Sequence, residues 1–242
     1  MISRREFLFT PLALAAQTRP PEALLAECVV FPRAYTCCAQ PAPARRALET
    51  GKFPHALGRE DAAAISLDDL SRVRPGRIAV FTSAVGDGSG SPFEKSVKVP
   101  LAIYAPGLLS PRIADEILIS TIDLAPTVLA LRGERVPARL QGRDLSGLLL
   151  GRSYDVPDSV YIEGGMGTPG EWRSVIRGFE KLVMDLNSEV THLYNLADDP
   201  DEATNLAQDS GSQLTRDALT ALIRVWKRKL SDGVDPSGLK RR

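Results

Sequence analysis

The chain has 242 residues, and its 30 lysine and arginine residues balance 30 aspartate and glutamate residues, so the formal net charge is zero. Hydrophobic residues make up 43% and charged residues 25%, a composition typical of globular proteins that excludes disordered and collagen-like chains. Basic residues cluster only at 227–229 and 240–242, which is too little for a broad positive surface. We therefore expect no nucleic-acid partner and no stable membrane span.

The first residues are typical of an export signal. Arg4 and Arg5 precede a short apolar run at 7–16 that ends in small residues, a pattern similar to a twin-arginine signal. The run is too short to cross a bilayer, and Pro11 interrupts it. We expect residues 1–20 to be this signal and the mature chain to be periplasmic or extracellular.

Cysteines and histidines are few. Cys28, Cys37 and Cys38 are odd in number, and adjacent cysteines rarely pair, so at most one disulfide is expected. His55 and His192 are the only histidines and no Cys-x-x-Cys pair is present, so the spacing predicts no familiar zinc site. Both histidines are expected to be surface residues or hydrogen-bonded turn residues.

The first part of the chain mixes predicted helices with predicted strands. Helices are expected at 22–27, 43–50 and 120–131, and strands at 29–31, 77–82 and 99–104. Gly51 is a plausible stop for the second helix, and Pro126 is tolerable only in the first turn of the third. A turn is expected near 66–70 and a glycine-rich loop at 86–91.

The pattern changes near residue 161. Short strands divided by turn residues are expected at 174–177, 181–185 and 191–194, and they predict a small antiparallel sheet. A final helix is indicated by an apolar face made of Leu219, Leu222, Ile223, Trp226 and Leu230. We therefore predict an α/β core at 21–155 and a C-terminal α+β subdomain at 156–242, made of an antiparallel sheet and a closing helix.

Several segments resemble sulfatases of the alkaline phosphatase superfamily. Residues 31–38, followed by 41–55, resemble the active-site segment of these enzymes. Further matching stretches follow in the family's order at 80–101, 123–127 and 172–206. The resemblance implies a shortened alkaline-phosphatase-like sheet, an ancestry in sulfuric ester hydrolysis, and a sulfated small molecule or glycan as the partner.

The resemblance also implies a nucleophile that this chain lacks. The family uses Cys-x-Pro-x-Arg at a helix start, where the cysteine matures to formylglycine and the helix favours the sulfate charge. Pro41 occupies the position of that cysteine and has no nucleophilic atom. Arg45 matches the arginine of the motif, whereas Cys38 lies three residues before Pro41 and does not fit it. Arg45 is thus the remnant of the catalytic motif.

The family's calcium ligands are missing as well. An Asp-Asp pair should follow a first strand, but the prolines at 20–21 lead straight into a helix, as though that strand had been removed. Ala84 and Val85 replace a second ligand pair, Ser89 replaces a lysine, and the family's long middle part is reduced to 57–74. We therefore predict neither calcium nor formylglycine nor another cofactor. Removal of a strand should leave unpaired backbone and exposed apolar surface.

Four other features have simple structural interpretations. The acidic run 198–202 is expected to be a turn rather than a calcium loop, and the glycines at 164–167 a turn rather than a phosphate cradle. Trp172 is either a pocket residue or, more commonly, a packed aromatic, and Trp226 is expected in the core.

Three functions remain open from the sequence. The favoured one is a sulfatase-family protein without turnover, a pseudoenzyme. The second is a binder of sulfated or phosphorylated ligands that uses the helix start and Arg45, although this arginine can equally be an ion-pair partner. The third is a working hydrolase with an atypical nucleophile such as Cys38 or Ser83.

Overall fold

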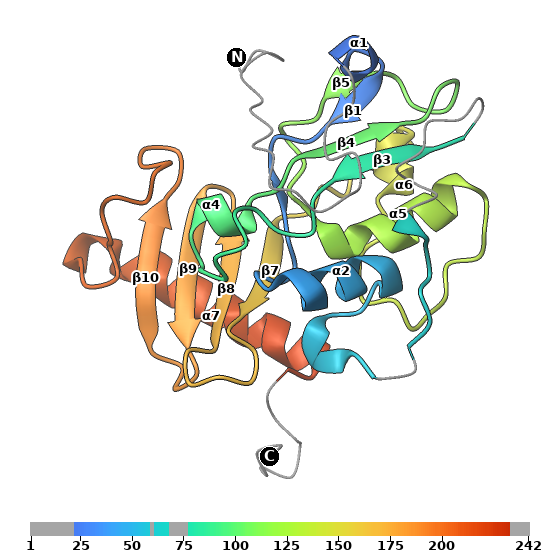
Figure 1. Ribbon diagram of the computed structural model, residues 1–242. Coiled ribbons are helices and arrows are strands. Elements are labelled where there is room, and N and C mark those ends of the chain that lie inside the picture. The colour runs from blue at the N-terminus through green and yellow to red at the C-terminus, as the bar shows by residue number, and fades with distance from the viewer. Residues whose placement is uncertain (1–21, 59–60, 68–76, 233–242) are drawn as a thin grey trace.

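A computed structural model describes residues 22–58, 61–67 and 77–232 (Figure 1). The predicted export signal and part of the predicted turn at 66–70 lie outside the described residues. The helices are α1 (Glu22–Leu25), α2 (Pro41–Thr50), α4 (Glu94–Val97), α5 (Leu124–Leu131), α6 (Ser146–Leu149) and α7 (Gln213–Leu230), with 3-10 turns η1 (Pro54–Ala56), η2 (Thr121–Asp123) and η3 (Ser210–Ser212). The strands are β1 (Cys28–Val30), β2 (Ala34–Tyr35), β3 (Ala79–Thr82), β4 (Leu101–Tyr104), β5 (Arg112–Ile113), β6 (Ile119–Ser120), β7 (Ser159–Gly164), β8 (Trp172–Arg177), β9 (Glu180–Asp185) and β10 (Val190–Asn195).

The first sheet is mixed and has the strand order β3-β4-β1-β5. β1 runs antiparallel to β4 and parallel to β5, and all three of its residues are buried. Val29 of β1 packs in one cluster with Ile103 of β4 and Val128 of α5, so the core of this half lies between the sheet and α5. Because β1 is paired on both sides, the gap expected from a removed strand is not visible around it.

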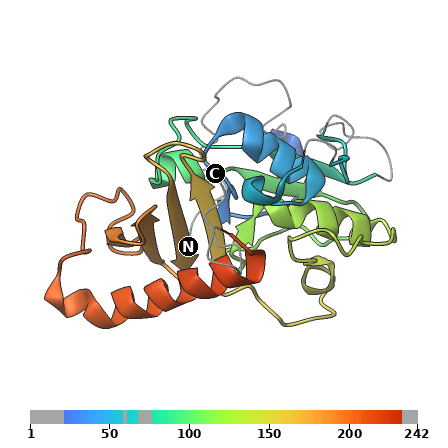
Figure 2. The ribbon, with the colours of Figure 1, turned by 90° about the horizontal axis from the view of Figure 1, so that it is seen from below.

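The second sheet is antiparallel, with the order β10-β9-β8-β7, and α7 lies along one of its faces (Figures 1 and 2). Leu219 and Ile223 of α7 are fully buried against Val175 and Leu182, because the apolar stripe of the helix faces the apolar side of the strands. The predicted antiparallel sheet and closing helix are confirmed, and so is the α/β fold class.

The ends of the helices in the first part of the chain mostly lie near the predicted positions. Gly51 ends α2 in the left-handed region at φ 67° and donates its N–H to the carbonyl of Ala47 at 2.8 Å. Pro126 lies in the first turn of α5, where a missing N–H costs nothing. The helix expected at 22–27 ends at Leu25, and the one expected at 120–131 begins as the 3-10 turn η2.

β7 of the second sheet lies against the segment that leads into α2. Glu163 of β7 donates its backbone N–H to the carbonyl of Cys37 at 3.0 Å, and its own carbonyl accepts the N–H of Ala39 at 2.9 Å. A short parallel pairing of β2 with β6 lies on the same stretch of chain. These bonds hold the family-like segment, from Cys37 to Pro41, against the end of β7.

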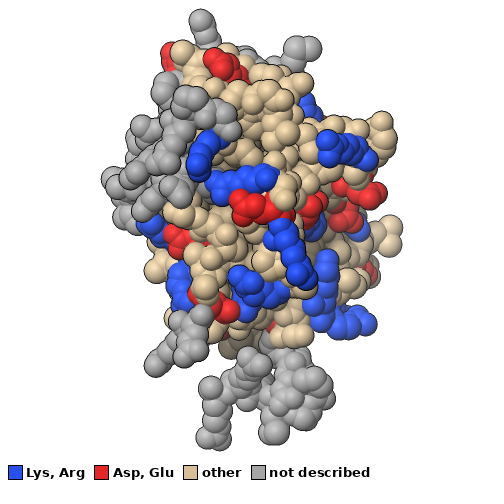
Figure 3. All heavy atoms as spheres, turned by 90° about the vertical axis from the view of Figure 1, so that its right-hand side faces the viewer, with Lys and Arg blue, Asp and Glu red and all other residues tan. Residues whose placement is uncertain are grey.

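Lysine and arginine side chains are interspersed with acidic ones on the face shown in Figure 3. Oppositely charged neighbours weaken one another's field, so this face offers no unbroken positive area for a polyanion. Among the described residues, no helix has the length and apolarity that crossing a bilayer would require.

Candidate functional site

The start of α2 is where the family motif places its nucleophile. Pro41 is the first residue of the helix, and Pro43 lies in the same turn, so two of the first backbone positions carry no N–H. The side-chain oxygen of Gln40, the residue before the helix, accepts the backbone N–H of Met166 at 2.9 Å. The helix start therefore offers fewer donors to an anion than an ordinary helix N-terminus does.

Arg45 lies on the surface of α2. Its side chain is 43% exposed, and its Nε is 3.5 Å from Oε1 of Glu49, one turn further along the helix. Such exposed pairs along a helix contribute only a few tenths of a kcal/mol. The arginine that matches the motif is thus an ion-pair partner here.

The two residues that the resemblance aligns with the family's second ligand pair are apolar and lie near the motif. Ala84 and Val85 pack against the cluster that contains Cys37 and Cys38 and the inner face of α2. Neither side chain has an atom that binds a hard cation. At the expected metal site, the structure therefore has an apolar contact between these two residues and the cluster beside α2.

The three cysteines all lie among the described residues and are buried, and no disulfide joins them, whereas the sequence allowed at most one. Burial raises the pKa of the Cys38 thiol to about 12, although the N–H of Gln40 donates to its sulfur at 3.4 Å. Burial also raises the pKa of Cys37 well above its ordinary value. Since the thiolate is the nucleophilic form, neither cysteine is activated.

We expect the native protein to react with a thiol reagent such as 5,5′-dithiobis(2-nitrobenzoate) only after unfolding. The chain has 3 cysteines, and Cys28, Cys37 and Cys38 are each 0% exposed. The absorbance of the released thionitrobenzoate should therefore be near zero in buffer, and in guanidinium it should correspond to three thiols per chain. Rapid labelling of one thiol in the native protein, located by peptide mass spectrometry at Cys38, would contradict this burial.

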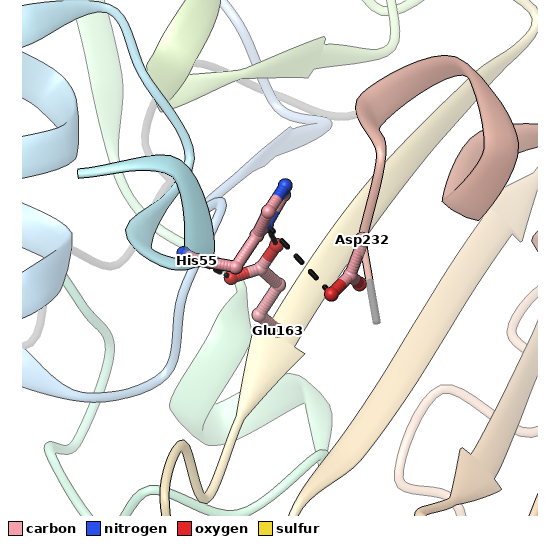
Figure 4. A group of neighbouring side chains, drawn as sticks. All are labelled: His55, Glu163 and Asp232. Carbon is pink, nitrogen blue, oxygen red and sulfur yellow. Dashed lines mark hydrogen bonds and ion pairs between the residues drawn. The ribbon is translucent and has the colours of Figure 1, made fainter. Parts of the chain in front are cut away.

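A compact polar cluster lies next to the start of α2 (Figure 4). It consists of His55 in η1, Glu163 at the end of β7 and Asp232 after the end of α7. His55 Nδ1 is hydrogen-bonded to Glu163 Oε1 and lies 3.9 Å from Asp232 Oδ1. Its other ring nitrogen, Nε2, is 3.0 Å from the carbonyl oxygen of Leu230. The side chains of His55, Glu163 and Asp232 are 11%, 0% and 1% exposed.

A second set of contacts fixes the carboxylate of Asp232. Arg173 of β8 donates from Nε to Oδ2 at 2.5 Å and from Nη2 to Oδ1 at 2.8 Å. Tyr161 of β7 donates its hydroxyl to Oδ2, and Glu171 accepts a further bond from Arg173 Nη2 at 2.7 Å. The two bonds from Arg173 therefore favour the charged form of the Asp232 carboxylate and fix its orientation.

The protonation of the cluster follows from burial and from these pairs. Burial lowers the pKa of His55, but the hydrogen bond and charge of Glu163, with the charge of Asp232, outweigh it and raise the pKa. Burial raises the pKa of Glu163, and His55 opposes that effect only in part. For Asp232, burial acts upward, yet the bonds and charge of Arg173 hold its pKa below the ordinary value.

Neither the composition nor the spacing of the sequence revealed this cluster. Its three members come from η1, β7 and the end of α7, so no local motif contains two of them. His55 lies in a hydrogen-bonded turn, as expected, and His192 is a partly exposed residue of β10. The one available signal was a histidine at the end of the family-like segment 41–55.

The other predicted features lie as follows. The carboxylate of Asp199 accepts the backbone N–H groups of Ala203 and Thr204, so the acidic run is a turn, as predicted. The glycines after β7 also form a turn, and Trp172 is packed in the core. Trp226 is a correction, because it is only partly buried: it packs against two buried clusters from outside and stacks on Tyr161 with a centroid separation of 6.0 Å.

Comparison with known proteins places these features in a family. A family model described as N-sulphoglucosamine sulphohydrolase, C-terminal, matches residues 91–229, more than half of the chain. Bovine arylsulfatase A is 45% identical over 89 residues, which cover 36% of this chain and 17% of that protein. A sulfatase of Formosa agariphila is 28% identical over 155 residues, covering 57% of this chain and 28% of the relative. The matched segments thus span less than a third of these relatives.

Solved structures agree. A putative sulfatase from Bacteroides thetaiotaomicron superposes with a TM-score of 0.59 at 25% identity, over 66% of this chain and 39% of that one. A 2-O GAG sulfatase gives a TM-score of 0.76 over 90% and 88% of the two chains, and at 15% identity it shows the shared fold. Because the family model matches more than half of the chain, the chain belongs to the sulfatase family.

Proposed function

We propose that this chain is a sulfatase-family protein that does not hydrolyse sulfate esters by the family's formylglycine and calcium chemistry. The observation that carries the proposal is Pro41 at the first position of α2, with Ala84 and Val85 packed in the cluster on the inner face of that helix. No side-chain atom at these three positions can attack sulfur or bind a divalent ion. Losing nucleophile and metal together removes the mechanism rather than slowing it.

The alternatives have weaker support. Binding of a sulfated small molecule or glycan would rely on Arg45, which pairs with Glu49, and on a helix start in which two prolines remove donors. A hydrolase that uses Cys38 would need a thiolate that burial suppresses. For a ligand-binding role of this chain, we propose a sulfated sugar as the ligand. Saturable binding of such a sugar, weakened by Arg45→Ala, would favour the second alternative.

The test is turnover of p-nitrophenyl sulfate by the purified chain in the presence of calcium. We expect no release of nitrophenol above the enzyme-free blank, while an active arylsulfatase in the same buffer releases it. Cys38→Ala is the matched variant, and it should behave like the wild type. Turnover by the wild type that disappears in Cys38→Ala would overturn the proposal in favour of an atypical nucleophile.

We also propose that the chain is exported. The support is the pair Arg4 and Arg5 before an apolar run, together with a Drosophila melanogaster relative described as an extracellular sulfatase, which is 40% identical over 80 residues. That match covers 31% of this chain and 7% of the relative. Periplasmic location and the twin-arginine route are part of the same proposal.

A further inference from the structure

The cluster of His55, Glu163 and Asp232 plays no part in the proposed loss of hydrolysis. We propose that these three side chains form a binding site for one divalent transition-metal ion of the zinc class. The inference is independent of sulfate chemistry, since it concerns a histidine-containing site and not the family's calcium position. It would hold whether or not the chain hydrolyses sulfate esters.

The distances suit such an ion. One ligand atom from each residue lies within 4.8 Å of the other two. In a tetrahedral zinc site with bonds of about 2.0–2.1 Å, ligand atoms lie ~3.4 Å apart. The 3.9 Å between His55 Nδ1 and Asp232 Oδ1 therefore needs to shrink by only ~0.5 Å. The Glu163 carboxylate must move away from Nδ1, so that an ion replaces the present hydrogen bond.

The side chains are already oriented as ligands usually are. His55 Nε2 lies at hydrogen-bond distance from the carbonyl of Leu230, and an N–H there leaves the lone pair of Nδ1 directed at the carboxylates. Asp232 is held by Arg173 and Tyr161 from behind. Its Oδ1 accepts one bond from Arg173 and retains a second lone pair. Metal sites depend on such outer contacts for their affinity.

The charges favour a divalent cation. Glu163 and Asp232 are two buried carboxylates, and the arginine that pairs with Asp232, Arg173, is shared with Glu171 and the carbonyl of Trp172. With a neutral His55, these groups leave negative charge in a nearly dry place, and buried charge is costly without a counter-ion. A divalent ion would supply that counter-charge by pairing with both carboxylates.

The donor set selects the kind of ion. Imidazole nitrogen is a good ligand for zinc and its neighbours, whereas calcium and magnesium prefer oxygen donors alone. One histidine with two carboxylates supplies three protein ligands, which leaves a fourth position for water. The site therefore differs in ligand type from the calcium centre that the family resemblance implies.

The experiment is calorimetric titration of the full chain, freed of metal by a chelator, with zinc chloride. We expect one ion bound per chain, and little heat with magnesium or calcium chloride. His55→Gln and Glu163→Gln should weaken binding by about tenfold or more, since each loses a direct ligand. His192→Gln is the matched control, because this histidine lies in β10 outside the cluster, and its affinity should equal that of the wild type.

Two results would overturn the proposal. One is a wild type that binds no zinc, in which case a proton alone joins His55 to the carboxylates. The other is zinc binding that survives His55→Gln, which would place the ion elsewhere. If the variants fail to fold by circular dichroism, zinc-edge X-ray absorption of the wild type decides instead. It should show only nitrogen and oxygen ligands at about 2.0–2.1 Å with imidazole scattering, and sulfur ligands or no imidazole would refute the site.

Discussion

Replacing Lys181 by methionine is expected to lower the free energy of unfolding by about 3–5 kcal/mol. The Lys181 side chain is 0% exposed in β9, and its Nζ lies 2.7 Å from Glu202 Oε1 and 3.2 Å from Glu94 Oε1. Methionine keeps the apolar stem but leaves Glu202, which is 3% exposed, without this cation, while Glu94 keeps only a 4.0 Å ion pair with Lys98. Urea unfolding followed by tryptophan fluorescence measures the loss.

The matched control is Lys95→Met. The Lys95 side chain is 70% exposed and lies 3.8 Å from Asp87, so its removal should cost less than about 1 kcal/mol. The double variant Lys181→Met with Glu202→Gln should recover part of the stability, because it removes the carboxylate left unpaired. Equal losses for the two single lysine variants would mean that burial does not decide the strength of these pairs.

Replacing Gly142 by alanine is expected to destabilise the protein by about 3 kcal/mol. A Cβ at this position would lie 2.0 Å from the carbonyl oxygen of Ile122, so the backbone itself must shift. The neighbours prevent such a shift, because the N–H of Gln141 is bonded to Gly51 O and that of Arg143 to Asp123 Oδ1, each at 2.7 Å. The midpoint of thermal unfolding should fall accordingly.

Gly147→Ala is the matched control for this substitution. Gly147 lies in α6, and the nearest atom to a new Cβ is Ser153 Cβ at 3.4 Å, an ordinary contact. Alanine there should leave stability unchanged within about 1 kcal/mol or raise it, since it reduces the freedom of the unfolded chain. Similar midpoints for the two alanine variants would show that the contact at Ile122 relaxes freely.

The C-terminal half was predictable because its patterns are long and local. β8, β9 and β10 are short runs divided by turn residues, and α7 carries a long apolar stripe of helical period. β7 was missed because a short, fully buried run has no diagnostic period, and it contains a charged residue, Glu163, of a type that is almost never fully buried unless paired. The two-residue strands β5 and β6 are too short for any period to appear.

The candidate site was also predictable only in part. The residue pattern predicted a helix at 43–50, which contains Arg45, and the family resemblance placed Pro41 at a helix start; α2 begins at Pro41. The cluster around His55 has no local signature, since Glu163 reaches it through the pairing of β7 with the Cys37–Ala39 stretch. Asp232 reaches it through the packing of the whole length of α7. No local sequence pattern predicts tertiary contacts of this kind.

The two sheets differ in how far apart in sequence their partners lie, and this bears on the order of assembly. β7 to β10 pair with their immediate neighbours in the chain, so each hairpin closes a short loop. In the other sheet, Val29 pairs with Ile103 and with Arg112, which requires closing a much longer loop. The C-terminal meander should therefore form faster. During vectorial synthesis β1 emerges first yet waits longest for its partners, so its apolar residues stay exposed to chaperones until β4 and β5 have been made.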